Sequence, residues 1–187
     1  LCDVDRSSIE DLHGWSDRLD LNEQVHIVAA DGMSMIDAHF ASPMPPHRSL
    51  VHIDPFDPHH KQSGGRSAVE LAGELVSAGV GLLYWYGYDD PKSRAWPLAD
   101  LIDHDARSLW CGDILIVDET GGTVTGGDLG AATTPGTGFG VVAANVSDRA
   151  IRLCTDLGQA LAATYRDSTL PNGSRGHIDF LHVASSD

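Results

Sequence analysis

Two hydrophobic patterns alternate along the chain: short apolar runs, and stretches in which apolar residues recur every three or four positions. The runs are typical of buried strands, and the second pattern is typical of amphipathic helices. Because the two alternate, the sequence predicts an α/β fold with a mostly parallel sheet and helices on both faces. The predicted strands are Leu1–Val4, Val25–Ala29, Leu50–Ile53, Gly81–Tyr88, Leu109–Val117, Gly138–Ala144 and His177–Ala184.

Five helices are predicted between these strands. The first opens at Ser7, which is placed as the N-cap with Glu10 in the capping-box position, and continues to Leu19. A short helix follows Gly32, and longer ones are predicted over 68–78, 91–107 and 148–165. After the strand that ends at 117, strands and helices no longer alternate regularly. The C-terminal edge of the sheet is therefore predicted to turn antiparallel.

The length and composition are those of one soluble domain, which we assign to residues 1–187. The chain is 42% apolar and 21% charged, and it contains no apolar run long enough to cross a membrane. No secretory signal is recognisable at the start. Three widely spaced cysteines suggest neither a disulfide framework nor a metal site, so we predict a cytoplasmic protein without a bound metal.

The charge balance bears on the class of partner. The formal net charge is −15, with only 12 lysines and arginines that are not clustered. A surface that binds a phosphate backbone needs basic side chains to neutralise the phosphates. The composition therefore disfavours a nucleic acid as the partner and favours a small-molecule substrate.

Acidic residues follow three of the predicted strands, at Asp3, Asp31 and Asp54. In open α/β sheets, ligands bind beyond the carboxyl ends of the strands. A carboxylate held there can accept hydrogen bonds from both hydroxyls of a ribose, and Asp3 is the best placed to do so. Asp31 can accept from an exocyclic amine, while Gly32 lets a purine ring approach the backbone. The alternative for each single Asp is a helix cap or a turn.

The segment Asp54-Pro55-Phe56 is the predicted chemical centre. Pro55 stiffens the turn, Asp54 can accept a hydrogen bond from a substrate amine, and Phe56 can stack on a flat substrate. A proline-containing turn with a solvated Asp54 is the alternative interpretation.

Three further residues are candidate substrate-binding residues. Tyr86 and Tyr88 lie near the end of an aromatic strand and are predicted to share one face with Tyr84, whereas Trp85 takes the other. Lys61 lies in the polar loop after the Asp54 turn. Core packing is the alternative for the tyrosines.

Three motifs at the strand ends resemble those of class I, Rossmann-like methyltransferases that use S-adenosylmethionine. They are Leu-Cys-Asp-Val-Asp at 1–5, Ala-Ala-Asp-Gly at 29–32 and Val-His-Ile-Asp-Pro-Phe at 51–56. Their order and spacing are most similar to the large-subunit ribosomal RNA adenine-N6 methyltransferase family. The likeness continues through 83–86, 114–117, 137–142 and 177–180.

The resemblance implies a methyltransferase sheet and S-adenosylmethionine as the cofactor. It places Asp3 at the ribose, Asp31 near the adenine and Asp54 at the target amine, which belongs to an adenine in RNA. The family's fourth motif reads Asp-Pro-Pro-Tyr, whereas this chain has Phe56 in the third place. The family's Gly-rich first motif and central strand have no counterpart here, so we expect the N-terminal part of the domain to be missing.

Two function classes remain open from the sequence. The first is an N-methyltransferase that acts on an adenine in RNA or on a small molecule. The second is a non-catalytic module that kept the fold and lost cofactor binding. A different nucleotide-dependent α/β enzyme is a third and weaker option.

Overall fold

The computed structural model describes residues 1–40, 49–55, 59–61, 65–88, 101, 104–124, 138–170 and 173–186. These residues form a mixed α/β structure with four helices, a two-stranded sheet and a six-stranded sheet. The chain divides into two compact units, Leu1–Pro45 and Pro46–Asp187. The two-stranded sheet belongs to the first unit and the six-stranded sheet to the second.

The first unit is a strand–helix–strand–helix segment. It contains β1 (Cys2–Asp3), α1 (Arg6–Arg18), β2 (Val28–Ala29) and α2 (Gly32–Phe40). β1 and β2 pair in parallel, with Cys2 opposite Val28 and Asp3 opposite Ala29. Parallel neighbours need a crossover connection, which α1 provides here. Both strands therefore end at the same edge of their sheet.

The start of α1 differs from the prediction. The N-cap is Asp5 and not Ser7, because the Asp5 carboxylate accepts a hydrogen bond from the Ser8 amide at 2.8 Å. The Ser7 hydroxyl also donates to this carboxylate, and these bonds hold the pKa of Asp5 below its ordinary value. Glu10 accepts from Arg6 Nε at 2.9 Å instead of closing a capping box. The capping pattern located the first turn of α1 correctly but placed the N-cap at Ser7, two residues after the observed Asp5.

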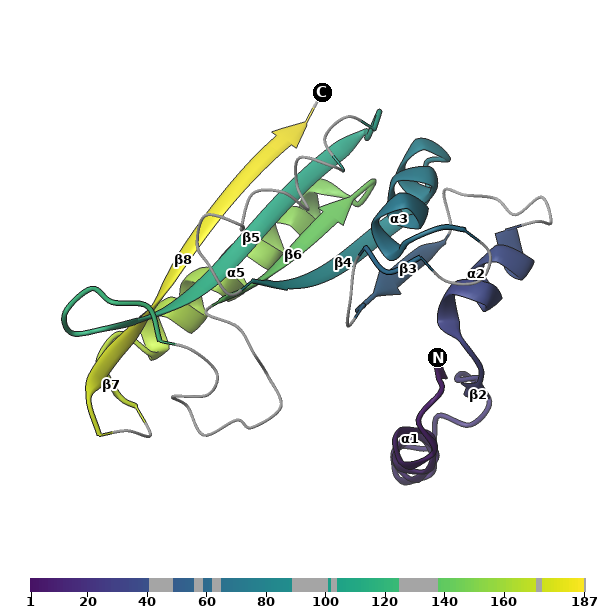
Figure 1. Ribbon diagram of the computed structural model, residues 1–187, viewed down its shortest axis with the longest axis horizontal. Helices are drawn as coiled ribbons and strands as arrows, with labels where there is room; N and C mark the ends of the chain where they lie inside the picture. The colour runs from purple at the N-terminus through teal and green to yellow at the C-terminus, as the bar shows by residue number, and fades with distance from the viewer. Residues whose placement is uncertain are drawn as a thin grey trace. The chain divides into compact units, whose positions relative to one another are not determined.

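The second unit is built on the six-stranded sheet, in the order β3-β4-β6-β5-β8-β7. Two helices pack on it in the described residues: α3 contacts β4, and α5 lies along β8 and β5, as Figure 1 shows. The elements are β3 (Leu50–Ile53), α3 (Ala68–Ser77), β4 (Gly81–Tyr88), β5 (Ser108–Asp118), β6 (Gly138–Ala144), α5 (Asp148–Thr164), β7 (Ser168–Thr169) and β8 (Arg175–Ser186).

The strand directions confirm the predicted antiparallel C-terminal edge and correct the mostly parallel sheet that was predicted before it. Within the six strands, β3 and β4 are parallel, whereas the pairs β4–β6, β6–β5, β5–β8 and β8–β7 are antiparallel. The parallel pair is the one whose two strands are joined by a helix, α3. Apolar runs look alike in parallel and antiparallel strands, so periodicity alone did not show where the direction changes.

Several predicted boundaries are confirmed, and others are wrong: β2, for example, is Val28–Ala29 and not Val25–Ala29. β3, β4 and β6 have the predicted bounds, and α3 begins with a capping box between Ser67 and Glu70. The N-cap of α5 is Ser147, one residue before the predicted Asp148. The helix predicted over 91–107 lies largely outside the described residues, but 104–107 are not helical.

The core of the sheet depends on tyrosines of β4 that cross the neighbouring strand. Tyr84, Tyr86 and Tyr88 are buried on one face, while Trp85 stacks on Phe139 at 5.4 Å, so the predicted alternation is confirmed. Gly140 of β6 lies directly beside Tyr86 and, on its other side, beside Asp113 of β5. Because Gly140 has no side chain, the Tyr86 ring covers it.

The Tyr86 hydroxyl donates a hydrogen bond to the buried Asp113 carboxylate and lies 3.1 Å from Cys111 Sγ. Burial raises the pKa of the Tyr86 hydroxyl, and Cys111 and Asp113 act in the same direction. The hydroxyl therefore keeps its proton at neutral pH and remains a donor. A buried carboxylate without hydrogen bonds would be strongly destabilising, and this contact helps to offset the burial of Asp113 in the sheet.

Asn145 joins three elements at one end of the sheet. It has a left-handed backbone (φ 53°), and its side-chain amide donates to the carbonyls of Val76 at 2.8 Å and Val80 at 3.0 Å. Its side-chain oxygen accepts from the Arg107 amide at 2.9 Å. These bonds connect the end of β6, the end of α3 and the segment that leads into β5.

We expect Gly140→Ala to destabilise the protein by about 1–3 kcal/mol, because the added methyl group overlaps the Tyr86 ring and the Asp113 carboxylate. The matched control is Gly87→Ala in β4. A Cβ there would lie 3.4 Å from Trp85 and 3.6 Å from Phe139, which is ordinary contact. Urea unfolding of both variants measures the effect. Equal midpoints for the two would contradict the packing of Tyr86 over Gly140.

Candidate functional site

The structure brings Asp3, Asp31 and Gly32 together at one edge of the first unit. Asp3 is the last residue of β1, and Asp31 follows β2 by two positions. Because β1 and β2 are parallel and in register, both carboxylates leave the same end of the sheet. The ideal Cβ position of Gly32 lies 3.7 Å from Cys2 Cβ, so the start of α2 packs against β1. This edge is the candidate cofactor site.

Each of the two carboxylates is held by neighbouring groups. Asp3 is half-buried, and its Oδ1 accepts a hydrogen bond from the Asp5 amide at 2.8 Å. Asp31 Oδ2 accepts from the Ser34 amide at 2.9 Å and from the Ser34 hydroxyl at 2.6 Å. Asp31 thus caps α2, while Asp3 closes the turn into α1. A carboxylate has lone pairs for more than one donor, so these bonds orient the groups without using all their acceptor capacity.

Asp54 and Pro55 lie in the second unit, directly after β3. Asp54 is exposed and Pro55 is half-buried, whereas Ile53 before them is buried in the core. The pairing of β3 with the longer β4 thus fixes where Asp54 leaves the sheet. Phe56, the third residue of the predicted catalytic segment, lies outside the described residues. Asp54 is available to a ligand that approaches this strand end.

Lys61 is engaged by the helix that follows. Its Nζ lies 2.8 Å from Glu70 Oε1, and the other Glu70 oxygen accepts from the Ser67 amide at 2.8 Å. The Lys61 hydrogen bond, with the Ser67 amide second, lowers the pKa of Glu70 to about 2. Lys61 therefore extends the capping box of α3. Its predicted role in binding substrate stays a prediction.

Tyr86 and Tyr88 are placed in the core. Tyr86 is 2% exposed and Tyr88 is 5% exposed, and their rings lie 6.3 Å apart. The Tyr88 ring covers Gly138 in the way that Tyr86 covers Gly140. Both side chains pack in the core of this structure, which was the alternative interpretation. Their contact with substrate stays a prediction.

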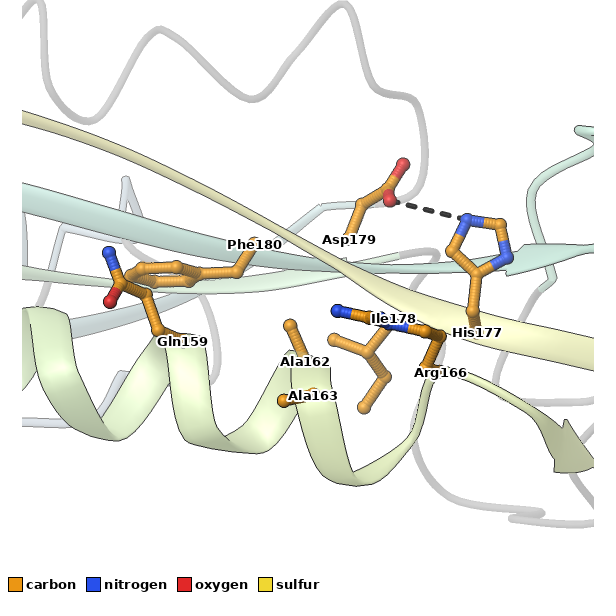
Figure 2. A pocket seen from close by; sticks show the side chains of 8 residues that line it. All are labelled: Gln159, Ala162, Ala163, Arg166, His177, Ile178, Asp179 and Phe180. Carbon is orange, nitrogen blue, oxygen red and sulfur yellow. Dashed lines mark ion pairs between the residues drawn. The ribbon is translucent and has the colours of Figure 1, made fainter.

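A groove between α5 and β8 was not predicted from the sequence. It has a volume of about 390 Å³, and its lining includes Ile178 and Phe180 of β8 with Ala162 of α5. Figure 2 shows Gln159 beside the Phe180 ring at one end and the Arg166 side chain near Ile178 at the other. His177 and Asp179 also line the groove, and their side chains, which form an ion pair at 3.2 Å, project from β8 away from α5 in Figure 2. An apolar floor between polar ends is suited to ligand binding, although this groove is open and shallow.

The sequence signals for these missed features were present but weak. An aspartate within the apolar run 109–117 indicates a buried partner, because Asp is almost never fully buried unpaired. The glycines at 138 and 140 alternate on one face of a strand, which is typical of close approach by a neighbour. The groove has no such local signal, because it depends on how α5 and β8 pack together.

Within the described ranges, no cluster of three or more His, Cys, Asp or Glu side chains is placed to hold a metal ion. None of the four described helices is both long and apolar enough to span a bilayer.

The sequence matches no family model and no curated protein. The structure is similar to the crystal structure of protein LPL1258 from Legionella pneumophila str. Philadelphia 1, which is described by the family name DUF519. The TM-score is 0.55 at 17% identity, and the match covers 100% of this chain and 60% of that chain. At this identity the likeness concerns the fold. The chain thus spans about 60% of the length of this structural neighbour.

We expect Lys61→Gln to raise the pKa of Glu70 from about 2 toward the ordinary carboxyl value, because the Lys61 hydrogen bond is the main cause of the lowering. Carbon-detected NMR titration of the Glu70 carboxyl measures this. A lowered carboxyl pKa stabilises the fold above about pH 4.3 and loses that contribution as the pH falls toward 2. The variant should therefore lose less stability than wild type over this range.

The matched control is Arg66→Gln, because Arg66 pairs with Glu74 and not with Glu70. An unchanged Glu70 titration in Lys61→Gln would show that Lys61 does not pair with the capping box. Lys61 would then be free to serve the strand end that carries Asp54.

Proposed function

We propose that this chain is part of an S-adenosylmethionine-dependent N-methyltransferase. The observation that carries the proposal is the pair Asp3 and Asp31, which leave the same edge of a parallel strand pair. Carboxyl ends of parallel strands are where nucleotide-like ligands bind in α/β proteins. The motif resemblance at 1–5, 29–32 and 51–56 supports the same assignment. The proposal includes the fold type, a Rossmann-like methyltransferase sheet.

The residues at this edge fit the nucleoside part of the cofactor. Asp3 would accept hydrogen bonds from the ribose hydroxyls, since its carboxylate is half-buried and oriented by the Asp5 amide. Asp31 and Gly32 would lie beside the adenine, with Asp31 held by Ser34. S-adenosylmethionine would supply the methyl group, activated as a sulfonium. The roles of the protein are to bind and orient it.

Asp54 and Pro55 are proposed to position the target amine. Pro55 restricts the backbone after β3, and the exposed Asp54 carboxylate would accept a hydrogen bond from an amino group. That bond aims the nitrogen lone pair, which is the main requirement for an in-line methyl transfer. Phe56 is proposed to stack on the ring that bears the amine.

The substrate is proposed to be an amino nitrogen of an adenine in RNA or of a small molecule. The family resemblance favours RNA. The net charge of −15 favours the small molecule, because a polyanion would be repelled without compensating basic side chains. Lys61, a basic residue near the Asp54 strand end, pairs with Glu70, which weakens its contribution to phosphate binding.

A non-catalytic, partner-binding module is the second candidate, and specific observations favour it. Tyr86 and Tyr88 are buried in the core, and Lys61 is paired with Glu70. All three residues predicted to bind substrate therefore have structural roles. Such roles are expected in a domain that has retained the fold and no longer binds a substrate.

We expect Asp54→Asn to reduce methyl transfer by about 100-fold while leaving stability unchanged, because an exposed side chain that positions the amine is lost without disturbing the core. The assay follows labelled methyl groups from S-adenosylmethionine in the full-length protein, with stripped ribosomal RNA and free adenosine as separate acceptors. Asp105→Asn, at another exposed position of the second unit, is the matched control.

The acceptor that becomes labelled decides between RNA and a small molecule. Wild-type protein that transfers to neither acceptor and binds no S-adenosylhomocysteine would contradict the enzyme proposal. Equal transfer by Asp54→Asn and wild type would contradict the role of Asp54.

A further inference from the structure

The outer edge of β8 has an open backbone over most of its length. On one side β8 pairs with β5 from Gly176 to Ser186, whereas on the other side β7 pairs only with Arg175 and Gly176. Among the strands that the structure describes, none pairs with this second edge from His177 onward. Figure 1 shows β8 as the long outer strand next to β5. An edge of this kind presents unpaired amide and carbonyl groups to another strand.

The side chains of this edge do not protect it from pairing. From Phe180 to Ser186 the sequence is Phe-Leu-His-Val-Ala-Ser-Ser, with no lysine, arginine, acid or proline. Proteins usually place such residues on exposed edges to prevent association. Leu181 is 47% exposed and Val183 is 63% exposed, and the two share one face of the strand. The edge is therefore both open and apolar.

We propose that the occupant is a second copy of this chain, paired antiparallel through β8 about a two-fold axis at His182. Within the open edge, the stretch Ile178–Ser186 is centred on His182, so self-pairing about His182 uses all of it and leaves out only His177, next to β7. In that register Leu181 lies opposite the partner's Val183, and Val183 lies opposite the partner's Leu181. The exposed apolar side chains of one copy therefore lie opposite those of the other. A two-fold symmetric interface, in which both copies use the same surface, requires this match.

The distribution of charge supports a second copy at this place. Each chain carries a net charge of −15, so two copies repel each other over most of their surfaces. The stretch Phe180–Ser186 is without formal charge, which lets two edges meet there without like-charge pairs. The lone acid of the open stretch, Asp179, lies opposite the uncharged position 185 of the partner in this register.

The groove under α5 adjoins the same edge. Its floor residues Ile178 and Phe180 belong to the open stretch, and Figure 2 shows them facing α5. An added strand would cover these side chains as well as Leu181 and Val183. One strand pair buries less than the roughly 1,600 Å² of a standard interface, so the dimer is weak, with a Kd on the order of 10 μM.

Sedimentation velocity of the chain at about 2–200 μM tests this dimer, because the range brackets that Kd. Val183→Lys and Leu181→Glu should each weaken the dimer at least about 10-fold, since each places a charge opposite an apolar side chain. An equimolar mixture of the two variants should dimerise again, because Lys at 183 then lies opposite Glu at 181. Leu157→Lys, on α5 and 61% exposed, should leave the dimer unchanged.

A monomeric wild-type chain throughout this range overturns the proposal. So does a dimer that Val183→Lys leaves intact, or a mixture of the two variants that stays monomeric, because each excludes the pairing about His182. Hydrogen exchange adds a second readout. Alternate amides of Ile178–Ser186 bond to β5 and are protected in the monomer, so the readout is the other set, which points outward. Protection of these outward amides at concentrations where the chain is monomeric assigns the edge to another occupant and also overturns the proposal.

Discussion

The sheet of the second unit depends on the hydrogen bond between the buried Tyr86 hydroxyl and the buried Asp113 carboxylate. This bond spans three strands, because Tyr86 on β4 reaches across Gly140 of β6 to β5. It requires three conditions at once: a glycine between the partners, a protonated tyrosine and exclusion of water. β3 pairs with β4, so the strand end that carries Asp54 is positioned by the same core.

The proposed chemistry uses the parallel strand pairs, and the antiparallel strands support them. In the described residues, both parallel pairs, β1–β2 and β3–β4, are connected through a helix. Each has carboxylates at its carboxyl end: Asp3 and Asp31 in the first unit and Asp54 in the second. The strands β4, β6 and β5 supply most of the buried core of the sheet, and β8 forms its open outer edge. The two proposals of methyl transfer and of dimer formation therefore rest on different parts of the chain.

Local pattern predicted much of this structure. The apolar runs gave the bounds of β3, β4 and β6, and period-2 alternation placed Tyr86 and Trp85 on opposite faces. What it missed is set by contacts between distant residues. The antiparallel C-terminal edge was predicted, but the antiparallel pairs inside the sheet, the Asp113 partner and the α5–β8 groove depend on which elements become neighbours. The Lys61–Glu70 pair was missed because a basic residue in a polar loop has no pattern that distinguishes helix capping from ligand binding.

The central claim is that the carboxylates at the β1–β2 edge hold the nucleoside of S-adenosylmethionine. Calorimetric titration of S-adenosylhomocysteine into the full-length protein tests it most directly, with Asp3→Asn compared with Asp11→Asn on the exposed surface of α1. An asparagine at position 3 can still accept the hydrogen bond from the Asp5 amide, but it lacks the negative charge that strengthens a hydrogen bond from a ribose hydroxyl. The account predicts saturable binding that Asp3→Asn weakens about 10- to 100-fold and Asp11→Asn leaves unchanged. Absence of binding, or equal affinity in both variants, would contradict it.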